Sequence, residues 1–241
     1  MLRDVNTDLD LRLAEARQRG AIALDEPSGK QVLASFGIDV PRGCVIPVGA
    51  SVREAVAALA PPFVVKVIAQ KVVHKSDVGG VRLGLGDAGG VEAAIAELGA
   101  SLRSKNIEAQ GWLVEEMIPG GVEMVVGGIT DPEFGPMVMV GLGGVFVEVL
   151  KDVAFRICPI DARDAFEMIE ELRGSSLLRG ARGREPVSVP AIVDVLLRLG
   201  KGDGLLMRCQ AHVAEVDINP LIVTNERAVA ADARFILRQP D

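Results

Sequence analysis

Residues 66–82 read KVIAQKVVHKSDVGGVR, and this stretch decides how the rest of the chain is interpreted. It carries the cations Lys66, Lys71, Lys75 and Arg82 against the single acid Asp77, a formal +3 in a chain of net charge −7. A lysine inside a β-branched strand, followed by a glycine-bearing basic loop, is typical of a polyphosphate grip made of backbone N–H and ammonium groups. We therefore expect Lys66 and Lys75 to bind phosphate. An exposed hairpin with solvated lysines is the alternative, which the apolar surroundings of Lys66 make harder to accept.

A second stretch, EVDINPL at residues 215–221, indicates a cation site. Residues two apart on a strand share a face, so Glu215, Asp217 and Asn219 line up, and Pro220 is expected to end the strand. The strand-like run that follows brings Asp232 opposite Asn219 in the implied hairpin. Carboxylate and amide oxygens suit Mg²⁺ held together with nucleotide phosphates. A solvent-facing polar stripe on an edge strand would give the same pattern.

A third stretch, WLVEEMIPGGVEMVV at residues 112–126, joins an apolar strand to an acidic pair and a Pro-Gly-Gly turn. Extended backbone beside Met117 and Ile118 offers hydrogen bonds and apolar cover to an adenine edge. Glu123, eight residues after Glu115, is placed to accept ribose hydroxyl groups. An ordinary hairpin remains the alternative for this stretch.

Composition narrows the class of protein. The 241 residues are 49% hydrophobic and 24% charged, which is typical of a folded chain, and the acidic balance disfavours nucleic acid and anionic membranes as partners. The longest uncharged stretch, residues 134–147, falls short of the roughly 20 apolar residues of a spanning helix. Three scattered cysteines and no leader-like N-terminus predict a soluble, cytoplasmic protein. Neither GxxxxGK[ST] nor a helix-opening GxGxxG occurs, which weakens P-loop and Rossmann interpretations.

The pattern of elements predicts an α+β, mixed α/β fold with antiparallel pairs. Helices and strands alternate without a strict βαβ rhythm, and a boundary near residue 110 divides the chain into 1–110 and 111–241. Periodicity and turn residues place the elements as follows. We expect helices over the first twenty residues and over 25–36, 91–103, 161–172 and 189–199, and strands over 63–68, 81–85, 111–117, 122–129, 136–141, 145–149, 213–218, 221–224 and 228–232.

Taken in order, the three stretches resemble an ATP-grasp domain. The runs KVIAQKVVHKSDVGGV, GVEMVVGGITDPEFGPMVMVGLGGVFVEVLKDVAFRICPI and EVDINPLIVT are similar to the β subunit of ADP-forming (NDP-forming) acyl-CoA synthetases, relatives of the succinyl-CoA synthetase β chain. The resemblance spans residues 20 to 238. It implies a two-lobed ATP-grasp fold with largely antiparallel sheets that holds ATP–Mg²⁺ between an N-terminal lobe (1–110) and a C-terminal lobe (111–241).

The resemblance also implies roles for individual residues. Lys66 would contact the nucleotide phosphates, and Glu123 would be the ribose carboxylate. The strand Glu115, Glu116, Met117 and Ile118 would be the adenine hinge. Asn219 and Asp232 would hold Mg²⁺ with Asp217 close by, and Arg156 could reach phosphate.

His74 has a separate implied role as a transient phosphoryl acceptor. It would relay the group between the nucleotide and a phosphohistidine on a partner α subunit, since a neutral imidazole is nucleophilic near pH 7. The family reaction is acyl-CoA + ADP + phosphate ⇌ carboxylate + CoA + ATP, with CoA and the acyl substrate on the α subunit of an α2β2 assembly. Two alternatives remain at this point: a nucleotide-sensing ATP-grasp module without ligase activity, and a stand-alone ATP-grasp carboxylate ligase.

Overall fold

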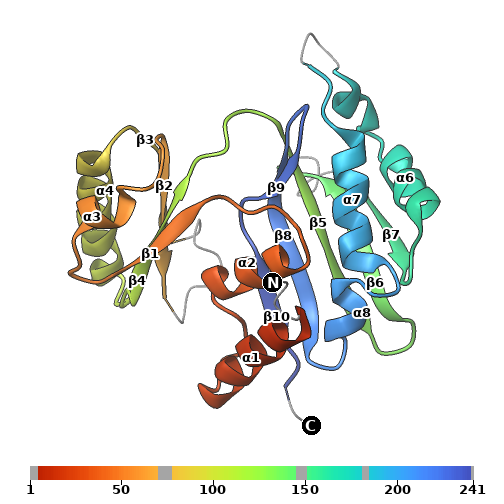
Figure 1. The fold of residues 1–241 in the computed structure, drawn as a ribbon, viewed down its shortest axis with the longest axis horizontal. Coiled ribbons are helices and arrows are strands. Elements are labelled where there is room, and N and C mark those ends of the chain that lie inside the picture. Colours follow the sequence, from red (N-terminus) through yellow and green to blue (C-terminus); the bar gives the residue numbers. More distant parts are fainter. Residues whose placement is uncertain (1–4, 70–77, 145–150, 181–184, 240–241) are drawn as a thin grey trace. The chain divides into compact units, whose positions relative to one another are not determined.

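The computed structural model describes residues 5–69, 78–144, 151–180 and 185–239 (Figure 1). Contacts between Cα atoms divide the chain into two compact units. The small unit is Pro41–Pro119, and the large unit combines Met1–Val40 with Gly120–Asp241.

Helices and strands alternate irregularly along the chain. Their order is α1 (Val5–Gln18), α2 (Glu26–Ser35), β1 (Gly43–Pro47), α3 (Val52–Val56), β2 (Phe63–Ile68), β3 (Val81–Leu85), α4 (Ala88–Ser104), β4 (Gly111–Glu116), β5 (Val122–Asp131), β6 (Gly135–Leu142), β7 (Val153–Ile157), α6 (Ala162–Glu171), the 3₁₀ helix η1 (Ser175–Arg179), α7 (Val189–Gly200), α8 (Leu205–Cys209), β8 (Val213–Val223), β9 (Ala228–Ala230) and β10 (Arg234–Leu237).

The small unit is a four-stranded antiparallel sheet in the order β1-β4-β2-β3. Helices α3 and α4 pack on one face of it. Alternate residues of β2 (Phe63, Val65 and Val67) join Trp112 and Val114 of β4 in the core beneath these helices. The intervening residues of both strands therefore face the other side of the sheet, and Lys66 and Glu115 are among them.

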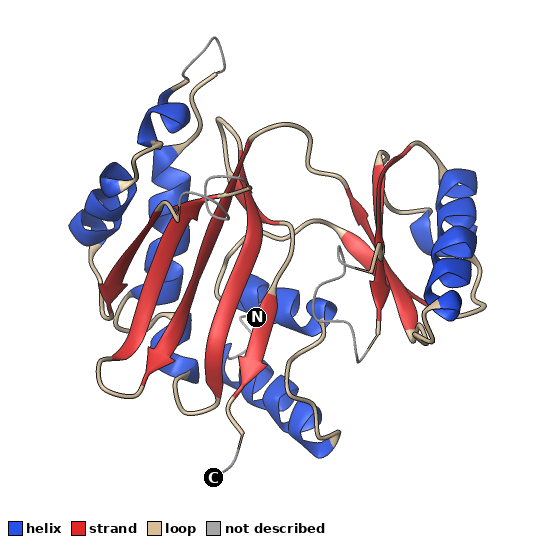
Figure 2. Cartoon of the chain, turned by 180° about the vertical axis from the view of Figure 1, so that it is seen from behind, coloured by secondary structure: helices blue, strands red, loops and turns tan. Residues whose placement is uncertain are grey.

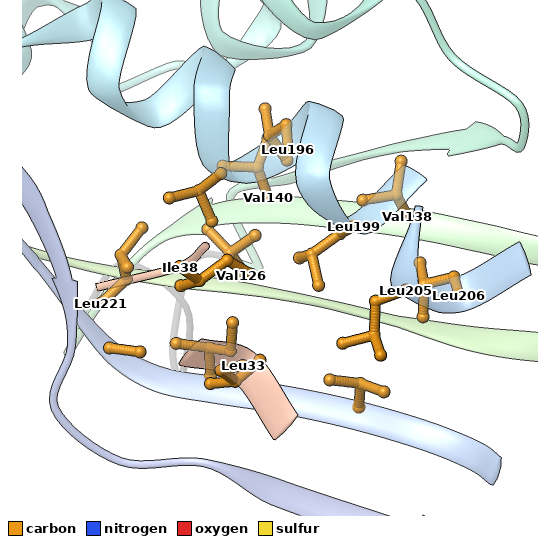
Figure 3. Close-up of a cluster of buried hydrophobic side chains, with 14 of the residues drawn as sticks. Leu33, Ile38, Val126, Val138, Val140, Leu196, Leu199, Leu205, Leu206 and Leu221 are labelled. Carbon is orange, nitrogen blue, oxygen red and sulfur yellow. The ribbon is translucent and has the colours of Figure 1, made fainter. Parts of the chain in front are cut away.

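The large unit is a six-stranded antiparallel sheet in the order β10-β8-β5-β6-β7, with the short β9 also paired to β8. Figure 2 shows this sheet from the face that the described helices leave open. The helices pack on the opposite face, where the side chains of β5, β6 and β8 form one cluster with those of α2, α7 and α8 (Figure 3). Fully buried members of this cluster, such as Leu33, Val126, Val140, Leu196 and Leu221, have lost almost all contact with water.

The antiparallel sheets and mixed helix and strand content confirm the expected fold class. The expected strand over 145–149 lies outside the described residues. The contact division differs from the expected boundary near residue 110, because strand 111–116 is paired between β1 and β2 and so belongs to the small unit. Residues 1–40 join the large unit through their apolar contacts, which the order of the sequence does not reveal.

Strand β8 contradicts one expectation, since it continues through Pro220 to Val223. The register with β5 shifts at this point, between Met124 and Val126, so that a residue without an N–H group is accommodated at an irregularity in the ladder. No described helix has the length and apolar composition that crossing a bilayer requires.

Candidate functional site

In the small unit, Lys66 and Glu115 form a buried ion pair. Lys66 lies opposite Leu113 and Glu115 lies opposite Val64 in the β2–β4 ladder, so the two side chains are diagonal neighbours on the face away from α3 and α4. Lys66 Nζ is 3.0 Å from Glu115 Oε2, and the two side chains are 8% and 3% exposed. A lysine at this strand position requires such a partner, because an unpaired charge in an apolar sheet is costly.

The predicted adenine hinge begins at the end of β4. Its residue Glu116 is committed to local structure, because its carboxylate lies 3.2 Å from Arg42 Nη1 and accepts the N–H of Ala60 at 2.9 Å. The backbone N–H groups of Glu116 and Met117 donate to Arg42 O and Pro62 O, both at 2.8 Å. These two amides are therefore already used within the small unit, and the next hinge residue, Ile118, is half-buried.

In the large unit, the β-ladders bring Asn219 and Asp232 together. Asp217 pairs with Arg234 on one side and Leu221 pairs with Ala230 on the other, and both pairs belong to the same register. Asn219 is therefore opposite Asp232, in the break between β9 and β10. This is the juxtaposition that the hairpin pattern predicts, whereas the metal-binding role of the two residues stays a prediction.

Asp217 lies on the same strand face but has a different partner. Arg234 Nη2 is 2.5 Å from Glu215 Oε1 and 3.5 Å from Asp217 Oδ2, so one guanidinium bridges both carboxylates. Sequence reasoning did not identify Arg234, although its place two residues after Asp232 in the same hairpin puts it on that face. Asp232 also accepts a hydrogen bond, from the N–H of Ala233 to Oδ1 at 2.8 Å.

The side-chain oxygens of Asn219 and Asp232 are suitable ligands for Mg²⁺ that is bound together with a polyphosphate. Within the described residues, no three or more His, Cys, Asp or Glu side chains gather as a metal cluster, so that part of the chain holds no cage made of these groups. An amide oxygen and a carboxylate oxygen on facing strands are hard ligands. Mg²⁺ in nucleotide sites is commonly bound by one or two such groups together with phosphate oxygens and water.

Glu123 is exposed on β5, opposite Ile222 of β8. Its neighbour Met124 is in the helix-side core, so Glu123 faces the open side of the sheet, as Asp217 and Asn219 do. The peptide of Gly143 lies against it and donates to Glu123 O at 2.8 Å. A Cβ atom at residue 143 would come within 2.8 Å of the same oxygen, so the close approach requires glycine there.

Arg156 lies elsewhere. It is opposite Val138 of the buried core, and its guanidinium is paired with Glu171 of α6, with Nη1 3.0 Å from Oε2. Hydrogen bonding to Glu171 raises the pKa of Arg156, and the same bond lowers the pKa of Glu171. Strand alternation thus places Arg156 on the helix-covered face, away from the acidic groups of the open face. The arrangement does not support the phosphate contact predicted for it.

His74 and Lys75, the predicted relay and a predicted phosphate ligand, lie outside the described residues. The chain around them is anchored at both ends within the small unit. Val67 N–H donates to Gly80 O at 2.9 Å, and Lys105 Nζ of the α4 C-terminus donates to Val78 O at 2.8 Å. The segment that carries the basic stretch therefore leaves and re-enters the sheet next to Lys66.

Comparison with known proteins identifies the class. A family model described as an ATP-grasp domain matches residues 15–237. Subunit beta of acetate–CoA ligase (ADP-forming) I from Pyrococcus furiosus is 39% identical over 219 residues, which are 89% of this chain and 91% of that subunit. Acetate–CoA ligase (ADP-forming) I from Archaeoglobus fulgidus is 42% identical over 212 residues, which are 87% of this chain and 30% of that longer protein.

A solved structure gives the same result. Dinucleotide forming acetyl-coenzyme A synthetase 1 of Ca. Korarchaeum cryptofilum, in complex with coenzyme A and Ca-AMPCP, superposes with a TM-score of 0.86 at 39% identity, covering 95% of this chain and 99% of that one. Another structure of that protein contains Mg-AMPPCP and has its phosphohistidine segment pointing towards the nucleotide binding site.

The chain belongs to the ATP-grasp family. Within it, the homologues of similar length are β subunits of ADP-forming acyl-CoA ligases, which confirms the resemblance seen in the sequence and the expected ligase class.

Proposed function

We propose that this chain is the nucleotide-binding β subunit of an ADP-forming acyl-CoA synthetase. The observation that carries the proposal is the match to a named β subunit over 91% of that subunit's length. The reaction is acyl-CoA + ADP + phosphate ⇌ carboxylate + CoA + ATP. The chain would contribute the nucleotide half of this chemistry.

Each unit carries its own candidate groups for nucleotide binding. In the small unit, Lys66, held by Glu115, binds phosphate oxygens, and the hinge backbone around Ile118 meets the adenine edge. In the large unit, Asn219 and Asp232 hold Mg²⁺, which when bound neutralises phosphate charge during transfer. The chemical logic is electrostatic, because phosphoryl transfer depends on positioning and on stabilising charge over the phosphate oxygens.

The partner is proposed to be an α subunit that binds CoA and the acyl group and carries a phosphohistidine, in an α2β2 assembly. His74 would accept the phosphoryl group from that residue and pass it to ADP. Support comes from the Korarchaeum protein, whose phosphohistidine segment points towards its nucleotide site in one structure. The Archaeoglobus fulgidus protein is a longer single chain, of which this chain matches 30%. Its greater length supports the proposal that the rest of the reaction is carried out by a part that this chain lacks. A cytoplasmic location agrees with the three cysteines, all of which are free thiols.

Two measurements on the purified chain test the proposal. Isothermal titration calorimetry should give saturable ADP binding that strengthens on addition of Mg²⁺. Mixing with a candidate α subunit, acyl-CoA, ADP and phosphate should then produce ATP and free CoA. Absence of nucleotide binding would refute the assignment. Binding without turnover, with α subunits that are active beside their own β subunits, would instead favour a nucleotide-sensing module.

A further inference from the structure

Helix α2 contains a buried ion pair outside every predicted site. Glu26 and Lys30 are one turn apart, with Lys30 Nζ 2.8 Å from Glu26 Oε1, and they are 5% and 4% exposed. A buried pair of this kind seldom adds net stability, because desolvating both charges offsets most of their attraction. Lys30 also makes a hydrogen bond to a distant part of the chain, and this bond points to a role other than stability.

Lys30 reaches the break between β9 and β10. Its Nζ donates to the carbonyl oxygen of Ala231 at 2.7 Å, across 201 positions of sequence. The N–H of Ala231 donates to Pro220 O at 3.0 Å, so the peptide units on both sides of Ala231 are fixed, one from β8 and one from α2. The preceding residue is fixed as well, since Ala230 N–H donates to Asp39 O at 2.8 Å.

The two candidate metal ligands lie next to the residues that these hydrogen bonds join. Asp232 follows Ala231 in the chain, and Asn219 precedes Pro220. Residues 231–233 lie between β9 and β10, and there the Lys30 ammonium adds a second support to the bond that Ala231 makes with β8. A charge-assisted hydrogen bond to the carbonyl is a strong restraint on the peptide that leads into Asp232.

We propose that Lys30 is a positioning residue for the predicted Mg²⁺ site, and that it holds Asp232 in place opposite Asn219. The inference rests on the proposed nucleotide function. Groups that orient metal ligands typically change metal affinity by 10–100-fold when removed. Lys30 would act through the backbone of the ligand segment, from the helix-covered side of the sheet, without contacting metal or nucleotide.

Three variants of the chain separate the effect of the Lys30–Ala231 bond on the metal ligands from the effect of the Glu26–Lys30 ion pair. Lys30→Met removes the bond to Ala231 together with the ion pair to Glu26. Glu26→Gln removes the ion pair and keeps the bond to Ala231. The double variant Glu26→Gln/Lys30→Met removes both without leaving a buried charge, and thermal melts by circular dichroism check the fold of all three.

The measurement is the Mg²⁺ concentration that gives half of the gain in affinity for fluorescent ADP, together with the ADP affinity without metal. For Lys30→Met and the double variant, we expect about a tenfold higher Mg²⁺ requirement, with metal-free ADP affinity within about twofold of the parent chain. Glu26→Gln should match the parent chain in both values.

A folded double variant with the parent Mg²⁺ requirement would overturn the proposal. A double variant that fails to fold would also overturn it. The bond to Ala231 would then be needed for the fold of the whole unit, and not specifically for positioning the metal ligands. If Lys30→Met alone is unfolded, the double variant decides. A parent chain that binds no Mg²⁺–ADP is a separate result, since it would refute the proposed function itself.

Discussion

Replacing Lys66 with methionine tests the phosphate-binding role proposed for the small unit, because it removes the ammonium while keeping much of the side-chain volume. At the observed 3.0 Å, two unit charges attract by about 5.5 kcal/mol at an effective dielectric constant near 20, before desolvation is counted. Lys66→Met removes the ammonium that is paired with Glu115, whose side chain is 3% exposed. Breaking a buried pair in this way destabilises a protein by about 3–5 kcal/mol.

The double variant Lys66→Met/Glu115→Leu separates stability from function. Apolar replacement of a whole buried pair is often close to neutral, so the free energy of unfolding in urea should recover to within about 1 kcal/mol of the parent chain. ADP binding should not recover, because the cation that contacts phosphate is still missing. Calorimetry and urea melts on the parent chain, the single variants and the double variant form a double-mutant cycle.

Two results would refute this reasoning. Parent-like ADP affinity in the double variant would mean that Lys66 does not bind the nucleotide. Parent-like stability in Lys66→Met would mean that the buried pair is not the desolvated interaction that its exposure indicates. The first result bears on function and the second on structure, so each can fail without the other.

Three further predictions concern the large unit and the relay. Asn219→Ala and Asp232→Asn should each raise the Mg²⁺ requirement for ADP binding by tenfold or more at roughly unchanged metal-free affinity, and a requirement like that of the parent chain would exclude the residue as a ligand. Asp217→Asn, a matched acid-to-amide change on the same face, should shift the same titration by less than about threefold, because its contact is a partly exposed ion pair; a tenfold shift would make it a ligand. His74→Asn should keep Mg²⁺–ADP affinity but lose turnover with an α subunit, and full turnover in this variant would reject the relay.

Local pattern was enough to predict most of the elements. The strand over 63–68, with its β-branched residues after two prolines, and the helices over 161–172 and 189–199, with their apolar spacing, were found almost to the residue. The short strand Arg234–Leu237 was missed, because four residues are too few to establish a period. Pro220 was expected to end a strand, since a sequence does not show that the register between β5 and β8 shifts beside it.

The candidate site residues likewise differ in whether local sequence or distant strand pairing determines their position. Asn219 and Asp232 could be placed together because a hairpin register is a local property, which two ladders on either side of the break reproduce. The face on which Arg156 lies depends on the pairing of β7 with β6, which its own segment does not specify. The bond from Lys30 to Ala231 joins residues 201 positions apart and could not be predicted from either segment.

A common feature links three of these groups, which is that a partner within the same unit holds the side chain or the backbone beside it. Lys66 is paired with Glu115, Asp217 with Arg234, and the segment before Asp232 is bonded to Lys30. Side chains already fixed by such partners lose little conformational freedom when a ligand arrives, which lowers the entropic cost of binding. The pairs are also nearly neutral in sum, so they add little long-range attraction for a polyanion in a chain of net charge −7. We therefore expect the attraction to come from the other cations of residues 66–82, and the paired groups to set the geometry of phosphate and metal binding.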